Sequence, residues 1–383
     1  MKQTDLILLT LLRSSLYDIS ADFPADTDWH KVLKEANAQT VAALAAKALP
    51  KTLTPEQLQP WKNIQYSQIA NYVRYLVAQD ELCRLFAEKN IPMAILKGSA
   101  AAVFYPQPSL RRMGDIDFIV PEAMFDQAGE IMLAAGYQSN GKVGVRHAAY
   151  HKDGLEFEMH RRFSHPGVDI ESYITEGLQH TERGAVNGHE FPMLPRLANG
   201  LILLEHMRSH LRVGLGLRQL IDWMMFVEHE LDDTFWRDTF CDVAREKNLD
   251  TLAVTTTRLC QKHLGLSESI TWCAGADDTL CDFLLENLLS SGNFGVKNRD
   301  GNAVQGVMIN IRREGLFPYL QRVGERDWKL YHQHHWLRPF AWLYESFVFM
   351  NRYIKIRKRK KSVLTAAMSS TDRYDLLKKL NIN

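Results

Sequence analysis

Residues 91–163 alternate between strand-like and helix-like patterns, whereas the sequence on both sides is mainly helical in pattern. Within this segment, the apolar run Met93–Leu96 indicates a short buried strand. Asp153-Gly154 stands between two runs of strand character, which is the strongest short-range signal for a β-hairpin. Strands that alternate with helices and then form a hairpin are typical of a small mixed sheet. We therefore predict an α+β protein, with one mixed-sheet domain flanked by helical regions.

Helical periodicity on both sides of this segment sets the expected domain boundaries. In residues 1–90, Thr54-Pro55 is a typical helix start, and the apolar spacing continues to Lys89. Residues 91–195 form the expected sheet-containing domain. In residues 196–383 the 3.6-residue pattern returns, over 198–211, 217–230, 234–247 and 251–264. The sheet is thus expected between two helical regions.

Composition narrows the class of protein. The chain has 383 residues, with 46 Lys plus Arg and 45 Asp plus Glu, so no overall charge favours a polyanionic partner. Its five cysteines are scattered and form no CxxC pair, which is typical of a reducing compartment. No stretch approaches the roughly 18 uncharged apolar residues of a membrane-spanning helix, and the first residues lack a cleavage signature. We therefore expect a cytoplasmic protein.

Two acidic residues are expected on one face of the strand that begins at Asp115. Asp115 and Asp117 are two positions apart, and side chains alternate between the two faces of a strand. Two carboxylates so close together repel each other unless a cation lies between them. A hard divalent cation such as Mg²⁺ takes oxygen ligands and leaves room for phosphates. The pair therefore predicts a metal site that is suited to phosphoryl chemistry.

The second strand of the predicted hairpin supplies a third acid. Glu156, Glu158 and His160 share one face of this strand, while the other face is apolar. We predict Glu158 as the third metal ligand or the general base, with Glu156 as the reserve candidate. His160 is within reach of the same site, where it could position an acceptor or orient a carboxylate. An ordinary hydrogen-bonding histidine is the alternative.

These segments resemble a known superfamily. Leu96–Ser99, Arg111–Val120 and Phe157–His160 are similar to the signature of the nucleotidyltransferases and, more narrowly, of the bacterial uncharacterised nucleotidyltransferase family. The resemblance covers residues 91–163, and Leu217–Trp223 also resembles the narrower family. It implies a polymerase-β-like fold, in which a Gly-Ser turn holds the triphosphate, an Asp-x-Asp strand binds Mg²⁺, and a third acid completes the cluster.

The resemblance assigns roles to individual residues. It implies that Asp115, Asp117 and Glu158 are the catalytic acids and the ligands of Mg²⁺ or Mn²⁺. It also implies that Gly98 and Ser99 contact the β- and γ-phosphates. Two departures are a longer gap between the turn and the Asp-x-Asp strand, and a Glu where the narrower family often has Asp. The second departure leaves the choice between the two glutamates open.

Cationic side chains next to these motifs are candidates for binding the phosphates. The planar fork of arginine suits phosphate recognition, which makes Arg111 the first candidate and Arg112 the second. Lys97 lies beside the Gly-Ser turn and could neutralise a phosphate. For all three residues, a solvated side chain at the protein surface is the alternative.

The implied activity is the transfer of a nucleoside monophosphate from an NTP, ATP first, to an acceptor hydroxyl, with release of pyrophosphate. Residues 196–383 are expected to bind the acceptor. The first candidate is a small molecule or sugar, the second a protein and the third RNA. One alternative is a glycosyltransferase that uses Asp115 and Asp117 on a nucleotide-sugar, although such enzymes need a nucleotide-binding sheet before this motif. Another is a non-catalytic interaction module, for example a toxin–antitoxin or defence partner, that has kept the fold.

Other polar residues in the helical regions have less specific interpretations. Glu205, His206 and His210 share a helix but lack the HExxH frame, so packing or pocket lining is favoured over zinc binding. Asp222 stands in an otherwise apolar helix, and buried acids are rarely unpaired. We expect it to pair with Arg218 one turn earlier or to face the cleft.

The last hundred residues combine a loop, an aromatic-rich helix and a basic tail. The glycine-rich segment 290–306 is expected to be a surface connection, and His332, His334 and His335 a surface cluster. The tail 352–361 follows the aromatic-rich segment 336–350. Such a basic end is most often a solvated helix terminus, and an anionic membrane surface or RNA are the alternatives.

Overall fold

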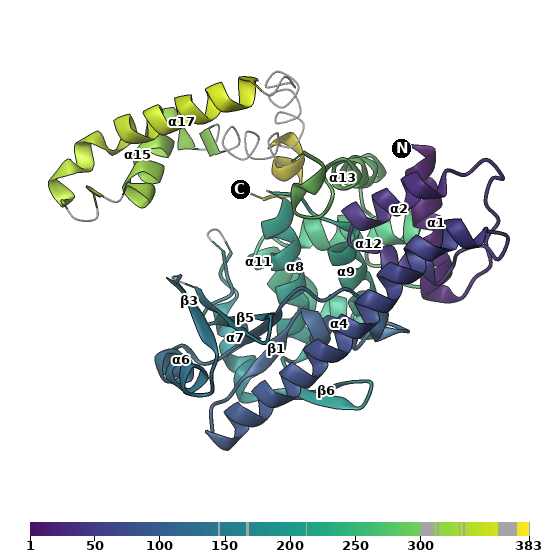
Figure 1. Cartoon of the computed structure of the whole chain (residues 1–383), viewed down its shortest axis with the longest axis horizontal. Helices are drawn as coiled ribbons and strands as arrows, with labels where there is room; N and C mark the ends of the chain where they lie inside the picture. The colour runs from purple at the N-terminus through teal and green to yellow at the C-terminus, as the bar shows by residue number, and fades with distance from the viewer. Residues whose placement is uncertain are drawn as a thin grey trace.

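The computed structural model describes residues 1–144, 146–165, 168–211, 213–298, 310–311, 314–328, 330–331, 334–358 and 374–382. Within these ranges the protein is α+β, with helices around one seven-stranded mixed sheet (Figure 1). This architecture confirms the fold class expected from the sequence. The division at residues 90 and 195 stays a prediction, because one cluster of buried apolar side chains runs from Ile7 to Ile382.

The sheet has the strand order β3-β4-β5-β2-β1-β7-β6. The strands are β1 Ala94–Leu96, β2 Ile116–Ile119, β3 Gln138–Val143, β4 His147–Lys152, β5 Leu155–His160, β6 Glu182–Val186 and β7 His189–Met193. The central strand β2 is antiparallel to β1 and parallel to β5. It begins one residue after Asp115, where we expected its start.

The helices fall into four groups along the chain. Before the sheet come α1 Gln3–Tyr17, α2 Trp29–Ala38, α3 Ala42–Ala46 and α4 Pro55–Glu88. Between strands lie α5 Gly98–Ala102, η1 Pro108–Leu110, η2 Glu122–Met124, α6 Phe125–Ala134 and α7 Glu171–Gln179. After the sheet come α8 Arg196–Leu211, α9 Leu217–Glu230, α10 Asp233–Phe235, η3 Trp236–Phe240, α11 Cys241–Glu246, α12 Asp250–Leu264, α13 Asp278–Ser291 and η4 Asn293–Asn298. The last group is α15 Leu316–Asp327, η5 His335–Phe340 and α17 Ala341–Lys358.

Two hairpins complete the sheet, and only one was expected. In the predicted hairpin, β4 and β5 are joined by Asp153 and Gly154, which both have positive φ angles, as a tight hairpin turn requires. The hairpin of β6 and β7 was missed, although Asn187-Gly188 between them is the same kind of turn signal. The β3 strand was missed as well.

One expected helix is interrupted. Residues 234–247 form the short helix α10, the π-helical turn η3 and the helix α11 in place of one continuous helix. The ring of Trp236 stacks on that of Trp272 with 3.9 Å between their centroids, and on that of Phe240 at 5.8 Å. A π-turn changes the direction of successive side chains, which is consistent with these aromatic contacts.

The long helix α4 fixes the segment that leads into β2. It begins at the predicted place, where Thr54 and Gln57 form a capping box. Its Gln68 donates to the carbonyl of Arg111 at 3.0 Å, and its Tyr75 hydroxyl donates to the carbonyl of Gly114 at 2.6 Å. These two bonds hold residues 111–114 against the helix.

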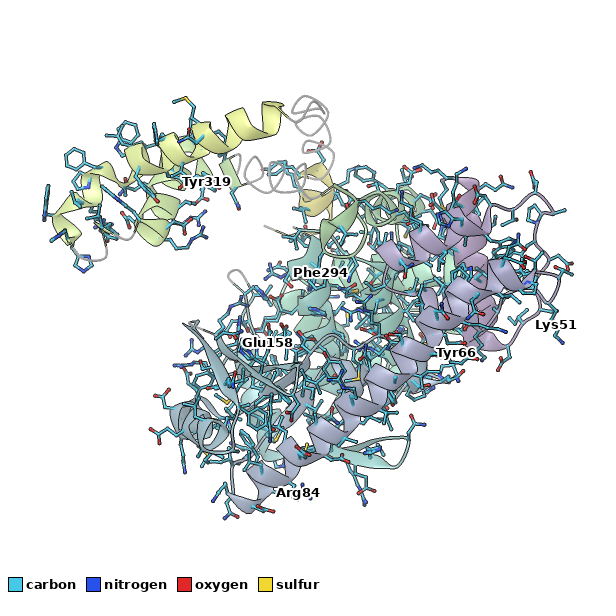
Figure 2. The ribbon with its side chains drawn as sticks, viewed as in Figure 1. Lys51, Tyr66, Arg84, Glu158, Phe294 and Tyr319 are labelled. Carbon is cyan, nitrogen blue, oxygen red and sulfur yellow. The ribbon has the colours of Figure 1, made fainter. Side chains whose placement is uncertain are left out.

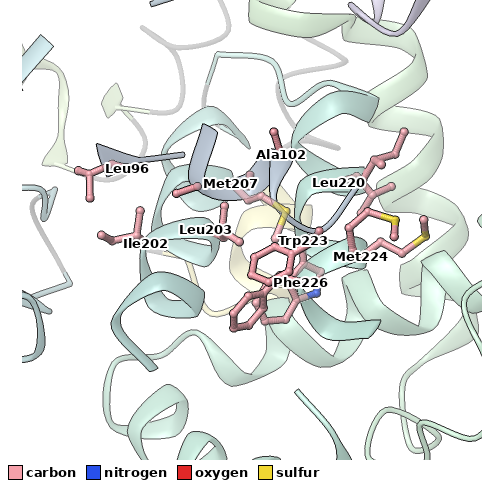
Figure 3. Close-up of a cluster of buried hydrophobic side chains, with 14 of the residues drawn as sticks. Leu96, Ala102, Ile202, Leu203, Met207, Leu220, Trp223, Met224 and Phe226 are labelled. Carbon is pink, nitrogen blue, oxygen red and sulfur yellow. The ribbon is translucent and has the colours of Figure 1, made fainter. Parts of the chain in front are cut away.

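The core behind the sheet joins β1 and α5 to the helices α8 and α9. Its buried side chains include Leu96, Ala102, Ile202, Leu203, Met207, Leu220, Trp223, Met224 and Phe226 (Figure 3). Gly200 allows α8 to approach closely, because a Cβ there would lie 2.7 Å from ring atoms of both Phe226 and Phe240. This packing places one face of α8 and the start of α9 close to the polar side chains at the centre of the sheet.

The helices α15 and α17 form a hairpin that extends away from the rest of the described chain (Figure 1). Tyr319, Leu320 and Val323 of α15 form a small buried apolar cluster, and Trp342 of α17 packs against it. None of the helices in the described ranges combines the length and apolar character that crossing a bilayer requires.

Candidate functional site

Asp117 lies at the centre of the sheet and is held by two neighbouring side chains. The register places it opposite Leu96 of β1 on one side and Glu158 of β5 on the other. The Nζ of Lys97 is 2.8 Å from its Oδ1, and the Nε2 of His160 is 3.0 Å from the same oxygen. Burial alone would raise the pKa of Asp117, but Lys97 and His160 outweigh it and hold this pKa below its usual range. The Asp117 side chain is therefore a carboxylate.

Lys97 faces the acids and not the solvent. It follows β1 with a φ of 45°, a left-handed conformation that is unusual for a residue with a side chain. Its ammonium group also lies 5.3 Å from the centre of the Phe163 ring. Burial alone would lower its pKa, but Asp117 and Asp115 raise it above the ordinary value, so the group stays cationic.

The other two predicted acids are close to Asp117. Burial and then the charge of Asp117 raise the pKa of Glu158 to about 7. The charge of Asp117 and then burial raise the pKa of Asp115 to about 6. Asp117 and burial thus act on both acids, with burial the larger cause for Glu158 and the charge of Asp117 the larger cause for Asp115.

Asp117, Glu158 and His160 form a compact group whose ligand atoms all lie within 4.8 Å of one another. Two carboxylates and an imidazole suit Mg²⁺ or Mn²⁺, because these ions prefer oxygen ligands and Mn²⁺ also accepts nitrogen. The residues therefore fit the expected metal. Asp115 is outside this compact group, where His160 takes the third place, but it lines the same cavity.

The acids lie in a cavity of about 260 Å³ between the sheet and the helices α8 and α9. Its lining consists of Lys97, Gly98, Arg111, Met113, Gly114, Asp115, Asp117, Arg146, His147, Glu158, His160, Phe163, His165, His206, Ser209, His210, Arg218 and Phe294. Glu158 comes from the sheet, whereas Phe294 comes from η4, in the segment expected to be a surface connection (Figure 2). Side chains far apart in the sequence thus line one cavity.

Three of the expected site residues lie outside this cavity. Ser99 is fully buried, and its hydroxyl is 4.0 Å from the sulfur of Met113. Glu156 is exposed on β5, so that Glu158 is the hairpin glutamate that faces the cavity. Arg112 is exposed and lines a neighbouring groove.

Arg111, the first candidate for binding phosphate, is occupied by Asp222. Its Nε and Nη2 donate to the two oxygens of Asp222 at 2.8 and 2.7 Å, and the Tyr105 hydroxyl donates to the same carboxylate at 2.7 Å. The expectation that Asp222 pairs with Arg218 was therefore wrong. A bidentate arginine–carboxylate pair is stronger than a contact along one helix turn, and the fold brings the two side chains together.

Arg218, which the sequence did not indicate as a phosphate ligand, lines the cavity instead. Its Nη1 donates to the carbonyl of Arg112 at 3.0 Å, and its buried Nε has no partner among the described residues. It also makes no ion pair within the described part of the chain. Burial and the nearby Arg111 lower the pKa of Arg218, against the opposing effect of Asp222 and Asp115. The signal for this residue was its place in the Leu217–Trp223 motif.

His206 and His210 face the acids from α8. Their ring centroids are 4.4 Å apart, and the His210 ring lies 4.7 Å from that of Phe294. Burial lowers the pKa of His210 to about 3 and that of His206 well below its ordinary value, so both rings are neutral. Glu205 is fully buried and contacts Arg208 at 2.8 Å and the backbone of His165 at 3.0 Å. These contacts agree with pocket lining and with packing, the two interpretations favoured over zinc.

A second hollow adjoins the cavity on the side of α4. This groove of about 520 Å³ shares Met113 and Gly114 with the cavity. The rest of its lining is mostly polar and consists of Asn37, Thr40, Ala42, Ala43, Asn63, Ile64, Ser67, Gln68, Asn71, Arg74, Tyr75, Arg112, Gly154 and Leu155. The cavity that holds the acids and this groove thus meet at Met113 and Gly114.

Outside the site, His334 and His335 are exposed, as expected. His332, residues 299–306 of the expected loop and the end of the basic tail lie outside the described residues. The side chains of residues 352–358 do so as well.

The comparison with protein families is decisive. Residues 25–265 match the model of a family described as uncharacterised nucleotidyltransferase. The chain belongs to this family. The matched range includes all three acids and Arg218, and it confirms the resemblance seen in the sequence.

Among solved structures, one similar to this chain is an antigenic nucleotidyltransferase-like protein from Paracoccidioides brasiliensis. The sequence identity is 15%, the TM-score is 0.33, and the alignment covers 51% of this chain and 95% of that one. No curated protein matches the chain significantly.

Proposed function

We propose that this nucleotidyltransferase-family protein is an active, metal-dependent enzyme. It transfers a nucleoside monophosphate from an NTP to an acceptor hydroxyl and releases pyrophosphate. ATP is the first candidate for the NTP. The observation that carries the proposal is the convergence of Asp115, Asp117 and Glu158 in one cavity, which Arg218 also lines with a buried Nε and no ion pair to the described residues. A cluster of acids and a separate cation are what a metal-bound triphosphate needs.

The three acids would hold Mg²⁺ or Mn²⁺, with His160 orienting Asp117 through their 3.0 Å contact. A divalent ion bound there would balance negative charge on the phosphates and polarise the phosphorus–oxygen bonds. Without the ion, Lys97 balances part of the charge of Asp117, and His160 contacts the same carboxylate oxygen. They keep its carboxylate in position and leave the other two acids facing the cavity.

Lys97 and Arg218 are our candidates for binding the triphosphate. Both line the cavity, and both carry charge next to the acids. Gly98, which follows Lys97 and lines the same cavity, is the residue of the predicted Gly-Ser turn that a phosphate could approach. Arg111 also lines the cavity, where its ion pair with Asp222 has a structural role.

The reaction would follow from positioning. The oxygen of the acceptor hydroxyl attacks the α-phosphorus, and the bond between this phosphorus and the oxygen that leads to the β-phosphorus breaks. Pyrophosphate leaves with its charge balanced by Lys97 and Arg218. The hydroxyl proton passes to a carboxylate of the cluster, for which the half-buried Glu158 is the candidate.

We propose that the NTP occupies the cavity and that the acceptor enters from the groove beside α4. The cations of the cavity favour the triphosphate, whereas the groove offers mainly neutral amide and hydroxyl groups. Such a lining suits the hydroxyls of a small molecule or sugar, with protein and RNA as further candidates. Binding of the acceptor by residues 196–383 stays the alternative.

Thermal unfolding with nucleotides tests this function against its rivals. We expect ATP and other NTPs to raise the Tm only when Mg²⁺ or Mn²⁺ is present, and we expect Asp117→Asn to abolish the effect. Glu156→Gln is the matched control, because this exposed glutamate lies on the neighbouring strand β5 but outside the cavity. A preference for nucleotide-sugars would favour a glycosyltransferase. No response to any nucleotide would favour a non-catalytic interaction module.

A further inference from the structure

The hairpin of α15 and α17, which we call the C-terminal arm, exposes a stripe of large apolar side chains. On α17, Leu343, Phe347 and Met350 are 47%, 65% and 56% exposed. Their spacing of four and three residues places them on one face of the helix. Just before α17, Trp336 and Phe340 are 72% and 46% exposed. Apolar residues gathered in this way are unusual on a surface that faces only water.

The side chains between α15 and α17 find their contacts within the arm. A Cβ at Gly324 would lie 2.0 Å from the carbonyl oxygen of Ala341, which shows how closely the two helices pack. Arg338 pairs with Glu325 at 2.9 Å, and Arg322 pairs with Glu314. The arm thus uses its internal contacts to hold its shape, and its apolar stripe remains uncovered in the described chain.

Charge distinguishes the arm from the rest of the molecule. Residues 310–361 contain 13 Lys or Arg and 4 Asp or Glu, which gives a net charge of +9, whereas the whole chain has +1. Much of this excess comes from the basic tail 352–361, and residues 352–358 of this tail are the last residues of α17. An exposed apolar stripe therefore continues into a strongly cationic segment.

We propose that the arm docks on the surface of an anionic lipid bilayer. Aromatic and aliphatic side chains partition into the boundary between headgroups and acyl chains, while lysine and arginine are attracted to anionic headgroups. The stripe combines Trp336 and Phe347 with the aliphatic Leu343, which favours a bilayer over RNA, because bases stack on aromatic rings but gain little from aliphatic ones. Docking would bring the active site to substrates at a membrane, whichever reaction it catalyses.

Vesicle co-sedimentation of the full chain tests the proposal. We expect binding to phosphatidylcholine vesicles that contain about 30 mol % phosphatidylglycerol, and at least about tenfold weaker binding to pure phosphatidylcholine. The double variant Leu343→Ser, Phe347→Ser should weaken binding by about tenfold or more, since it removes apolar contact with the bilayer. Val73→Ser, Val77→Ser on α4 is the matched control, because these valines are 52% and 49% exposed. This control should bind as the wild type does.

Further measurements decide against the proposal if it is wrong. Binding that is equal with and without phosphatidylglycerol, or unchanged in the Leu343, Phe347 variant, would overturn it. Two other results would also overturn it, each together with a lack of vesicle binding. One is binding of single-stranded RNA, and the other is a dimer that the Leu343, Phe347 variant dissociates. Circular dichroism and NTP-dependent stabilisation of the variant show that the fold is intact, which keeps this test separate from that of the proposed reaction.

Discussion

The two walls of the cavity differ in how their polar groups are partnered. On the sheet wall, one oxygen of Asp117 contacts both Lys97 and His160, at 2.8 and 3.0 Å. On the helical wall, the Nε of Arg218 and the Nδ1 of His210 are buried and have no partner in the described chain. Native proteins rarely leave buried polar groups unpaired. The difference indicates that the protein organises the sheet wall by itself, whereas a ligand completes the helical wall.

The two walls also differ in charge. The sheet wall holds three acids close together. The charge of Asp117 raises the pKa of Asp115 to about 6, and burial followed by the same charge raises that of Glu158 to about 7. The helical wall presents Arg218 and two neutral histidines. A metal-bound triphosphate would satisfy both walls at once, since it brings cations to the first and anions to the second.

The largest effect is expected on the sheet wall. Asp117→Asn should lower the rate of nucleotide transfer by about a thousandfold or more, because the amide is a poorer metal ligand and leaves Lys97 without its counter-charge. Steady-state kinetics with labelled NTP measures this. Glu156→Gln should stay within about twofold of the wild type. An equal loss in both variants would mean that the changes distort the paired strands β2 and β5, and that the loss does not come from a missing metal ligand.

Arg111→Gln should act on stability. The change leaves the carboxylate of Asp222 buried without its main partner, and breaking a buried pair costs about 3–5 kcal/mol. Urea unfolding monitored by circular dichroism gives this free energy. If stability were unchanged and only NTP binding were lost, Arg111 and not Arg218 would be the phosphate ligand.

Arg218→Gln should weaken NTP binding and leave stability almost unchanged, which is the opposite of the effect expected for Arg111→Gln. It removes a cation without an ion-pair partner in the described chain, so the KM for NTP should rise by about ten- to a hundredfold, which corresponds to a charged hydrogen bond. The free energy of unfolding should change by less than about 1 kcal/mol. Kinetics and urea unfolding of the same samples separate these effects. A large loss of stability with an unchanged KM would contradict a ligand-binding role.

The smallest effect concerns His210 and pH. Its pKa is about 3 in the folded protein and near 6.5 when unfolded, so the unfolded chain binds more protons between these values. Its contribution is present above pH 6.5 and is lost as the pH falls towards 3. Between pH 7 and pH 5 we expect it to lower stability by up to about 2 kcal/mol. His210→Gln should make the pH dependence of urea unfolding shallower over this interval, and an unchanged slope would show that the ring is not buried as neutral imidazole.

The sheet wall could be predicted from the sequence because its geometry is local. Alternation along a strand decides which way Asp117 and Glu158 face, and the Asp153-Gly154 turn sets the register of the hairpin. Strand pairing then brings these two acids side by side. The β6–β7 hairpin carried a similar signal in Asn187-Gly188 and could have been found by the same reasoning.

The helical wall could not be predicted in the same way because it depends on tertiary packing. Arg111 was predicted to bind phosphate, with a solvated loop arginine as the alternative, whereas its partner Asp222 lies 111 positions away in the chain. The approach of Arg218 and His210 to the acids follows from how α8 and α9 pack, for which Gly200 provides room. No short motif encodes such contacts. The choice between the two hairpin glutamates likewise needed the structure, in which Glu158 alone faces the cavity.

The most direct measurement of the central claim follows the fate of the α-phosphate. The protein is incubated with Mg²⁺ or Mn²⁺, a metabolite extract and each NTP, labelled in turn at the α- and the γ-phosphate. We expect the α-label to enter an acceptor and the γ-label to appear in pyrophosphate, with both signals lost in Asp117→Asn and retained in Glu156→Gln. Transfer of the γ-label to an acceptor, or α-label transfer that persists in Asp117→Asn, would contradict the account.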